Sequence, residues 1–308
     1  MLKMLRCAYF IFYWDEHIMP RTLEQGFEDF HNKLKTSAVE TAAAKSHRAS
    51  IEACLKSNFG LNRFVRIGSF GNGTNINSYS DVDYLACLPT TSLKQSSTRS
   101  LAIVRDALDT RFPRTGVKVS TPAVVCPFGT YKSEDTEVVI ADYIKEERGF
   151  KVYEIADGNG GWMQISPDAH NQYVAEVDAK HNGRVKRLIR FIKAWKYYLS
   201  VPIKSFYLEM RVAKYASSES VIIYDIDVKN ILKLLLDSDL ASMQDPMGFA
   251  GYINPCNSDA LKDDALSKLR TAVTRADKAR IAEANGDTKA AFDWWSMVYN
   301  GKFPSYYL

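Results

Sequence analysis

One stretch of small and polar residues, from Ile67 to Leu85, constrains this chain more than any other part of it. It reads IGSFGNGTNINSYSDVDYL, with a Gly68-Ser69 turn after an apolar run and two aspartates, Asp81 and Asp83, near its end. Side chains two residues apart in a strand point to the same side, so both carboxylates are expected on one face and Val82 on the other. A strand that begins with two carboxylates on one face is expected to have a cation beside it.

The residue types in this stretch point to phosphate and metal chemistry. Two neighbouring carboxylates repel each other unless a cation lies between them, and Mg²⁺ prefers such oxygen ligands. The N–H groups of a Gly-Ser turn and the serine hydroxyl are suited to hold phosphates. Together these features predict a site for a nucleoside triphosphate and its metal ions. The alternative is a solvated turn, because Asn, Ser and Asp gather in loops.

A third acidic residue is expected to complete such a site. The segment from Glu137 to Ile144 is rich in β-branched residues and predicts a strand. Asp142 lies within its apolar run, where an unpaired carboxylate would be costly. We therefore predict that Asp142 joins Asp81 and Asp83, and this three-part pattern outweighs the solvated-turn interpretation.

The order of these motifs resembles a known superfamily. A Gly-Ser, a spacer, an Asp-x-Asp and a later Asp resemble the polymerase-β-type nucleotidyltransferases. The longer form GSFGNGTNINSYSDVD is similar to one branch, the cGAS/DncV-like nucleotidyltransferases (CD-NTases) of bacterial anti-phage (CBASS) systems. The basic segment RFIKAWK from Arg190 and the K-S-(aromatic)-x-L-E element from Lys204 to Glu209 resemble the same branch. So does the ending, which runs from Trp294-Trp295 to Phe303-Pro304.

For the catalytic site, the resemblance implies three carboxylates around two Mg²⁺ ions, which Mn²⁺ could replace. The matching residues are Asp81, Asp83 and Asp142. The ions would position a ribose hydroxyl against an α-phosphorus and neutralise the leaving pyrophosphate. Asp142 is expected on the side of the attacking hydroxyl.

For the nucleotide, the resemblance implies contacts from two lobes. The Gly68-Ser69 turn would contact the triphosphate of ATP or another ribonucleoside triphosphate, and Lys193 and Ser205 would reach it from the second lobe. The ring of Phe206 or Tyr207 would stack on a base. Only one of two adjacent rings can face a pocket if the segment is extended.

The implied activity is the joining and closing of ribonucleotides into a cyclic di- or trinucleotide, with release of pyrophosphate. This second messenger would act on a separate effector in anti-phage defence, and a regulatory protein or an RNA is the implied activator. Two alternatives stay open at this point. One is a nucleotidyltransferase that acts on an RNA end or a small-molecule acceptor. The other is a catalytically silent regulatory protein that binds nucleotides, against which the three carboxylates argue.

The expected fold is α+β: a polymerase-β-like nucleotidyltransferase lobe with a mixed sheet, a mainly helical second lobe, and the active site in the cleft between them. Apolar patterns predict strands at 82–88, 117–125 and 137–145, and helices at 101–112, 184–199, 222–236 and 258–284. The stretch 288–299 closes the chain. The chain is expected to divide into an N-terminal extension, a catalytic lobe and a helical lobe, at 1–18, 19–160 and 161–308. The GNGG run at 158–161 is the expected turn between the lobes.

The catalytic lobe is expected to begin with a long helical segment. Thr22 and Gln25 have the spacing of a capping box, and Gly60 is a natural helix end. Ser37 marks a break between these points.

Several other signals are ambiguous. The basic side of the 184–196 helix is either a solvated face or a surface that attracts phosphates, an RNA or a protein activator. Asp225 and Asp227 form a second Asp-x-Asp but lack a Gly-Ser turn upstream, so they predict a helix start. His170 has no partner at metal-ligand spacing and receives no role.

Composition adds limits on class and location. The net charge of +4 suits a phosphate-handling protein without indicating nucleic-acid binding. Five cysteines without CxxC spacing predict neither disulfides nor zinc, which fits a reducing bacterial cytoplasm. The apolar run from Cys7 to Trp14 is shorter than the roughly 20 residues of a membrane span, so no integral membrane contact is expected. A short membrane-surface anchor is the alternative for these first residues.

Overall fold

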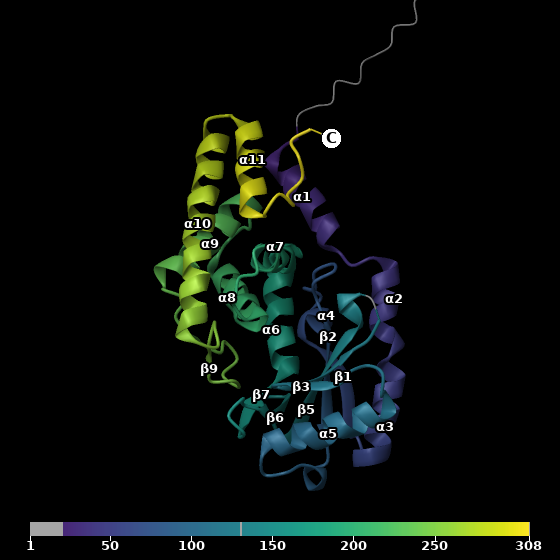
Figure 1. The fold of residues 1–308 in the computed structure, drawn as a ribbon. Coiled ribbons are helices and arrows are strands. Elements are labelled where there is room, and N and C mark those ends of the chain that lie inside the picture. Colours follow the sequence, from purple (N-terminus) through teal and green to yellow (C-terminus); the bar gives the residue numbers. More distant parts are fainter. Residues whose placement is uncertain (1–20, 130, 308) are drawn as a thin grey trace, which may run out of the picture.

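The computed structural model describes residues 21–129 and 131–307 of the chain. The extension expected at 1–18 lies outside these residues. A twisted sheet with helices on its outer face forms one part of the molecule, and a group of helices forms the other (Figure 1). The predicted α+β class, with a mixed sheet and a mainly helical second part, is confirmed.

The first described segment is a series of three helices, α1 (Leu23–Leu34), α2 (Ala38–Ser46) and α3 (Arg48–Phe59). The predicted capping box is present, because Thr22 accepts from the backbone of Gln25 and the Gln25 side chain accepts from the Thr22 N–H. Ser37 caps α2 and so breaks the segment where expected. Gly60 ends α3 with a left-handed φ of 74°.

Within the described residues, the sheet has seven strands and is mixed. Its main path runs β1 (Arg63–Ile67), β2 (Val82–Leu88), β5 (Asp135–Glu147), β4 (Ala123–Pro127) and β3 (Lys118–Ser120). β6 (Phe150–Ala156) pairs with β5 and carries β7 (Trp162–Ile165) on its other side. Strands β2 and β5 run parallel, and the other pairs are antiparallel. The single strand predicted at 117–125 is wrong, because β3 and β4 form an antiparallel pair there.

Alternation along β2 separates two faces of this sheet. Val82, Tyr84 and Leu88 are buried on the outer face, where α3 and α5 (Ser97–Arg111) cover them. Leu85 and Cys87 lie on the inner face with Val139 and Ala141 of β5. Because Asp83 shares the parity of Leu85, its carboxylate falls on the inner face, as the spacing predicted.

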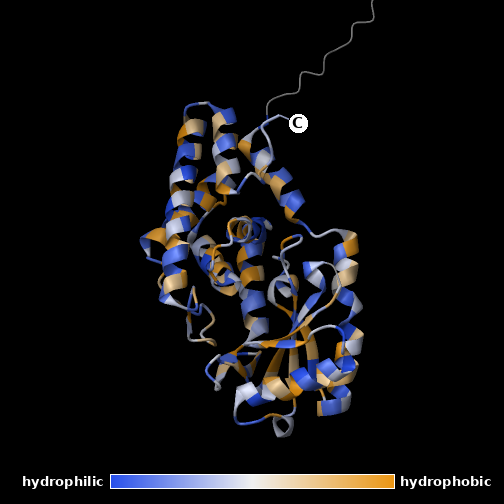
Figure 2. Cartoon of the chain, viewed as in Figure 1, coloured by the Kyte–Doolittle hydropathy of each residue, from blue (hydrophilic) through white to orange (hydrophobic). Residues whose placement is uncertain are grey.

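The helical part is built from α6 (Pro167–Lys180), α7 (Arg184–Tyr198), α8 (Ser205–Ser218), α9 (Tyr224–Asp237), α10 (Asp259–Ala284) and α11 (Thr288–Val298). Its helices alternate between polar and apolar faces, whereas the central strands are mostly apolar (Figure 2). The predicted helix start at Asp225 and Asp227 is confirmed, since both carboxylates lie in the first turn of α9.

Helix α1 packs with this helical part. The ring of Phe27 lies 5.1 Å from that of Phe191 and 5.2 Å from that of Trp295, centre to centre. Phe303, in the C-terminal W…FP ending, closes the same cluster at 5.0 Å from Phe27. Helix α1 thus belongs with the helical part, and β7 extends the sheet to Ile165, past the boundary expected at 160.

Two further features bear on the sequence-based expectations. In the described part of the chain, no helix combines the length and the apolar character needed to cross a bilayer. Cys54, Cys87, Cys126 and Cys256 are free thiols.

Candidate active site

The site is built on the pairing of β2 with β5. The parallel register places Glu137 directly opposite Asp83, and Leu85 opposite Val139 two residues further on. Neighbouring residues in register point to the same face of a sheet, so the carboxylates of Asp83 and Glu137 both lie on the inner face. Asp81 precedes β2 by one residue and adds a third carboxylate at the same edge.

Gly68 explains how the Gly-Ser turn and the aspartates fit together. It has a left-handed φ of 60°, and a Cβ atom at this position would lie 2.0 Å from Oδ2 of Asp83. A residue with a side chain therefore cannot take its place without displacing the carboxylate. Gly68 and Ser69 begin the one-turn helix α4 (Gly68–Asn72), which lies directly above Asp83.

The carboxylates of this site perturb one another strongly. The partial burial of Asp83 and the negative charges of Asp81 and Glu137 hold the pKa of Asp83 well above its ordinary value. Burial, followed by the charge of Asp81, raises the pKa of Glu137 to about 7. A hydrogen bond shared with Asp81 contributes to the same shift. Such mutual repulsion is what a bound cation relieves.

The structure corrects the placement of Asp142. Residue 142 pairs with Leu88, at the far end of β2, about 16 Å along the strand from the level of Asp83. Because side chains alternate along the strand, Asp142 also points to the outer face, as Leu88 does, and not to the inner face, as Asp83 does. The Asp142 carboxylate accepts a hydrogen bond of 2.8 Å from the Thr90 hydroxyl and takes no part in the cluster.

A lysine lies beside these carboxylates. Nζ of Lys132 is 3.4 Å from Oδ2 of Asp81 and 2.8 Å from Oδ2 of Asp135. The short segment that carries it is anchored on α2, because the Ser133 hydroxyl donates to the backbone oxygen of Glu40. Lys132 thus supplies positive charge to one edge of the acidic cluster.

The donor set fits magnesium. Within the described ranges, no three histidine, cysteine or acidic side chains converge closely enough to enclose an ion alone. Mg²⁺ needs no such cage, because it is commonly held by one or two carboxylates together with substrate phosphates and water. Asp81, Asp83 and Glu137 offer hard oxygen ligands on one face of the sheet, next to the turn expected to hold phosphates.

A buried ion pair from the helical part supports this turn. Lys193 is fully buried, and its ammonium lies 2.7 Å from Oε1 of Glu209. Glu209 also accepts from the Thr74 hydroxyl at 2.6 Å and from the Asn72 amide at 3.1 Å. Burial alone would raise the pKa of Glu209. The charge of Lys193 and these hydrogen bonds outweigh burial and keep the pKa below its ordinary value. Glu209 thereby connects the Gly-Ser loop, the segment 68–75 that follows β1, to the helical part.

Lys196 lies one helical turn beyond Lys193 on α7 and, unlike Lys193, contacts Ser205. Its ammonium donates to the Ser205 hydroxyl at 2.7 Å, and the hydroxyl of Tyr197 lies 3.2 Å from the same oxygen. Burial and the nearby charge of Lys193 lower the pKa of Lys196 to about 8, while Asp81 acts in the opposite sense. The positive charge of Lys193 also lowers the pKa of Asp83. The two lysines thus face the acidic cluster from the other part of the molecule.

The structure distinguishes the two candidate stacking rings. The Tyr207 ring is fully buried, and its hydroxyl donates to the backbone oxygen of Ala241 at 2.8 Å. The predicted stacking role is therefore wrong for Tyr207. Phe206 is 39% exposed and lies in the first turn of α8, next to Ser205. Phe206 is the ring available to a base.

The basic side of α7 is used internally. Arg184 pairs with Glu24, and Arg187 pairs with Glu28, both on α1. Arg190 donates to the backbone oxygen of Asn75 at 3.2 Å. These contacts favour a structural role for this face, in which it holds α7 against α1 and against the loop that contains Asn75.

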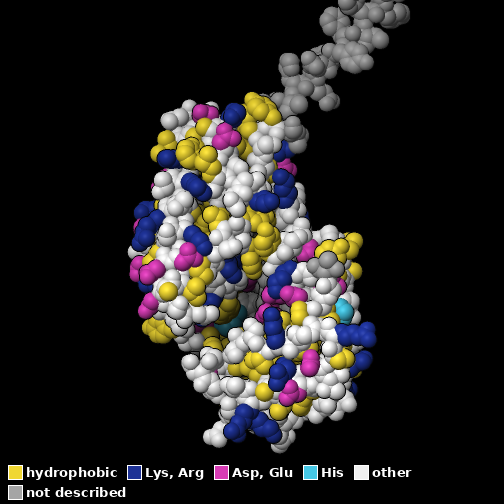
Figure 3. Space-filling view, in the orientation of Figure 1, with side chains coloured by type: hydrophobic (Ala, Val, Ile, Leu, Met, Phe, Trp, Pro, Cys, Tyr) yellow, Lys and Arg dark blue, Asp and Glu magenta, His cyan; other side chains and the backbone are white. Residues whose placement is uncertain are grey.

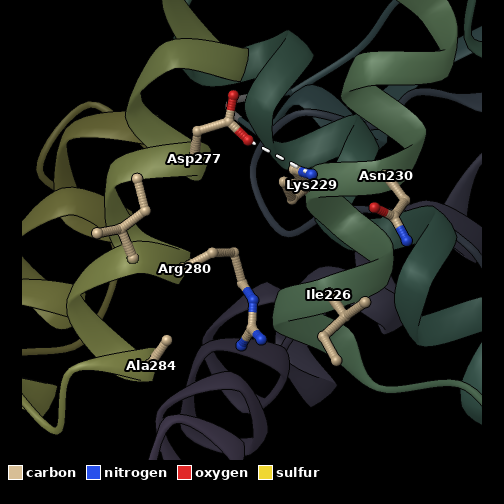
Figure 4. A pocket seen from close by; sticks show the side chains of 7 residues that line it. Ile226, Lys229, Asn230, Asp277, Arg280 and Ala284 are labelled. Carbon is tan, nitrogen blue, oxygen red and sulfur yellow. Dashed lines mark ion pairs between the residues drawn. The ribbon is translucent and has the colours of Figure 1, made fainter.

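The space-filling view shows a hollow between the sheet part and the helical part, with acidic and basic side chains along its edges (Figure 3). A separate concavity of about 530 Å³ lies between α9 and α10 (Figure 4). Its cations are already neutralised, because Lys229 pairs with Asp277 at 3.4 Å and Arg280 pairs with Asp225. The perturbed pKa values favour the acidic cluster, rather than this concavity, as the reactive site.

Glu137, Lys196 and Glu209 are the site residues whose positions the sequence analysis missed. Glu137 is the first residue of the predicted strand in which Asp142 was chosen, and the offset of five residues between them places them on opposite faces. That odd spacing was a usable signal, although only the register with β2 identifies Glu137 as the partner of Asp83.

Comparison with known proteins agrees with this geometry. Residues 21–178 match the model of the Second Messenger Oligonucleotide or Dinucleotide Synthetase (SMODS) domain. A probable cyclic nucleotide synthase of Bacillus cereus (strain VD146) is 27% identical over 174 residues, 54% of this chain and 51% of the relative. The cyclic AMP-AMP-AMP synthase of an Acinetobacter species is 28% identical over 177 residues, 49% of each chain. The chain spans about half the length of these curated relatives.

Solved structures share the fold across nearly the whole chain. CdnC of E. coli MS115-1, solved with ATP, has a TM-score of 0.72 at 17% identity, over 91% of this chain and 98% of that one. A mutant of the Vibrio cholerae di-nucleotide cyclase DncV, in complex with ATP and GTP, has a TM-score of 0.61 at 14% identity, over 92% and 89%. The match to the domain model covers more than half of the chain, so the chain belongs to the Second Messenger Oligonucleotide or Dinucleotide Synthetase family, the cGAS/DncV-like nucleotidyltransferases that its motifs resemble.

Proposed function

We propose that this chain is a metal-dependent nucleotidyltransferase that joins ribonucleoside triphosphates into a cyclic di- or trinucleotide and releases pyrophosphate. One observation carries the proposal: Asp83 and Glu137 lie opposite each other on parallel strands, and Gly68 lies directly against Asp83. Lys196 and Ser205 face this cluster from the helical part. Carboxylates for metal ions and donors for a triphosphate are thus brought close to each other from the two parts of the molecule.

The chemistry follows from these positions. The hydroxyl oxygen of one ribose forms a bond to the α-phosphorus of a second nucleotide as the α–β phosphoanhydride bond breaks. Pyrophosphate leaves with the bonding electrons. Glu137, which lies opposite Asp83 on the inner face, is the residue proposed to accept the hydroxyl proton. Two Mg²⁺ ions at Asp81, Asp83 and Glu137 would supply charge neutralisation at the reacting phosphorus.

The remaining residues hold the donor nucleotide in position. The Gly68-Ser69 turn and the Lys196 ammonium bind the triphosphate from opposite sides, and the Ser205 hydroxyl is shared with Lys196. Phe206 stacks on the base. Lys193 acts by its charge rather than by contact, because it is buried against Glu209. Positioning and charge stabilisation of this kind account for most of the catalysis expected in phosphoryl transfer.

The biological role is proposed by likeness to relatives. ATP as a substrate agrees with the CdnC structure solved with ATP, and a regulatory protein partner agrees with a CdnC structure solved as a complex with HORMA-deltaN. The product would act as a second messenger on a separate effector in bacterial anti-phage defence. The enzyme would work in the cytoplasm, where ribonucleoside triphosphates are abundant.

Product analysis without a primer tests the proposal. The protein is incubated with radiolabelled ATP, GTP, CTP and UTP and Mg²⁺ or Mn²⁺, and the products are treated with phosphatase and resolved by chromatography and mass spectrometry. A phosphatase-resistant product with the mass of a ring is expected. A Glu137→Gln variant should give none, and an Asp142→Asn variant should give the wild-type amount. Extension only of an added RNA would instead assign an RNA-end acceptor.

A further inference from the structure

The proposed stacking ring has a specific neighbour in the helical part. The Phe206 ring centre lies 5.0 Å from that of His170, and the two rings are inclined at 69°. His170 belongs to α6 and Phe206 to α8, which pack against each other. An edge-to-face arrangement at this distance is a favourable aromatic geometry. One side of the partly exposed Phe206 ring is therefore braced by a buried imidazole.

The imidazole is itself held by a buried carboxylate. Nε2 of His170 lies 2.9 Å from Oδ2 of Asp245, and both residues are nearly inaccessible, at 5% and 3% exposure. The Asp245 carboxylate also accepts from the backbone N–H groups of Met247, Phe249 and Ala250. Burial would raise the pKa of Asp245, but the contact with His170, followed by the backbone hydrogen bonds from Ala250 and Met247, holds it below its usual range. Such a network fixes both the carboxylate and the plane of the imidazole.

The loop organised by Asp245 reaches the sheet part of the molecule. It connects β8 (Met243–Gln244) with β9 (Tyr252–Ile253). Arg148, between β5 and β6, donates to the backbone oxygen of Met247 at 2.7 Å, and its guanidinium lies 4.2 Å from the centre of the Phe249 ring. Phe249 also contacts the ring of Phe150. Asp245 thus connects the support of Phe206 to a contact between the two parts of the molecule.

We propose that His170 and Asp245 are positioning residues that hold the Phe206 ring ready to stack on the base of the donor nucleotide. The inference rests on the proposed function, in which Phe206 is the stacking ring. A ring that is 39% exposed has several rotamers available, and each one that is removed before binding lowers the entropy lost when the base stacks. The pair acts on the base alone, because the triphosphate is held by Lys196, Ser205 and the Gly68-Ser69 turn.

The test compares a ligand that has a base with one that lacks it. Binding of a non-hydrolysable ATP analogue and of inorganic tripolyphosphate, each with Mg²⁺, is measured by calorimetry. The variants are His170→Ala, Asp245→Asn, Phe206→Ala and the double variant His170→Ala/Phe206→Ala. His181→Ala is a matched control, because His181 lies at the end of the same helix and also bonds to α8, through the backbone oxygen of Ala216.

We expect His170→Ala to weaken binding of the ATP analogue about 5-fold, the size of an aromatic pair contribution, and to leave tripolyphosphate binding unchanged. His181→Ala should change neither affinity. In the Phe206→Ala background, removal of His170 should have no further effect, because the ring that it supports is absent. Asp245→Asn keeps the volume of the side chain and should give a smaller loss in the same direction, which also covers the case in which His170→Ala does not fold.

Each of four results would overturn the inference. Equal weakening of both ligands by His170→Ala would indicate a general loosening of α6 against α8. Additive effects of His170→Ala and Phe206→Ala would mean that His170 does not act through this ring. If Phe206→Ala weakens analogue binding and His170→Ala does not, the proposed stacking by Phe206 is retained and the positioning role of His170 is rejected. Phe206→Ala without any effect on analogue binding would remove the stacking role itself, which is a failure of the proposed function.

Discussion

Glu137 lies opposite Asp83 in the parallel register of β2 and β5, on the inner face of the sheet. This relationship makes Glu137, rather than Asp142, the third carboxylate of the candidate site. Substitution of each residue by its amide keeps its size and removes its charge, so the two variants form a matched pair.

Glu137→Gln should lower kcat by at least about 100-fold, because it removes a metal ligand and the proton acceptor together. Asp142→Asn should stay within about twofold of the wild type, since an amide still accepts the hydrogen bond from Thr90. Pyrophosphate release measured at saturating nucleotide compares them. A reversed order of the two variants would return Asp142 to the site and exclude Glu137.

The raised pKa of Glu137 predicts a pH dependence of stability without metal. Its folded-state pKa of about 7 lies above its ordinary value of 4.5, so the folded protein binds this proton more tightly than the unfolded chain does. The contribution of Glu137 to stability is therefore greatest at low pH and is lost as the pH rises from about 4.5 to 7. In EDTA, Glu137→Gln should match the Tm of the wild type at pH 5 and exceed it by a few degrees at pH 8. A gap that does not change with pH would contradict this.

The sequence predicted the parts of the site that depend on local spacing. Asp81, Val82 and Asp83 alternate as expected, and Val82 is buried on the outer face. Gly68 is required where the Gly-Ser turn was expected, because the Asp83 carboxylate leaves no room for a Cβ atom. These features follow from the two-residue period of a strand and from backbone sterics, which need no knowledge of distant residues.

The wrong predictions concern residues that lie close together in the sequence and are distinguished only by their tertiary contacts. Asp142 and Glu137 belong to one strand, and only the register with β2 separates them. Lys193 and Lys196 lie one helical turn apart, and their distinct environments depend on Glu209 and Ser205 of α8. Likewise, an extended segment was considered for the two rings, but α8 begins at Ser205 and turns Tyr207 into the core.

Loss of the Glu209 charge should destabilise the fold. Glu209→Gln leaves Lys193 as a buried cation without a counter-charge, which typically costs about 3–5 kcal/mol. Urea denaturation of the double variant Lys193→Met/Glu209→Gln should show that most of this loss is recovered, because no buried charge remains. Asp264→Asn breaks an exposed pair with Lys268 and should change the free energy of unfolding by less than about 1 kcal/mol. An equally small effect of Glu209→Gln would show that the Gly-Ser loop does not depend on this pair.

Lys196 should make nucleotide binding pH-dependent. Its pKa of about 8 means that the ammonium is charged below that pH and becomes neutral above it, so KM for the triphosphate should rise between about pH 8 and 9. Lys196→Met should raise KM about 10-fold or more at pH 7. Lys196→Arg stays charged throughout and should remove the rise in KM at high pH. Steady-state kinetics from pH 6.5 to 9.5 distinguish the variants, and a wild-type KM that is constant over this range would exclude Lys196 from the phosphate site.

Lys132 should compete with metal ions for Asp81. Its ammonium lies 3.4 Å from Oδ2 of Asp81, and a divalent ion bound there would have to overcome the repulsion of this charge or displace it. In a partly solvated site, one such interaction is worth roughly 1 kcal/mol, so Lys132→Met should tighten Mn²⁺ binding about 5-fold in the absence of nucleotide. Lys145→Met, which breaks an exposed pair with Glu147 on the same strand β5, provides a control that should leave the Mn²⁺ affinity unchanged. Titration of free Mn²⁺ by electron paramagnetic resonance measures both variants. Unchanged or weaker binding in Lys132→Met would mean that Lys132 does not oppose the metal and that its contact with Asp81 is purely structural.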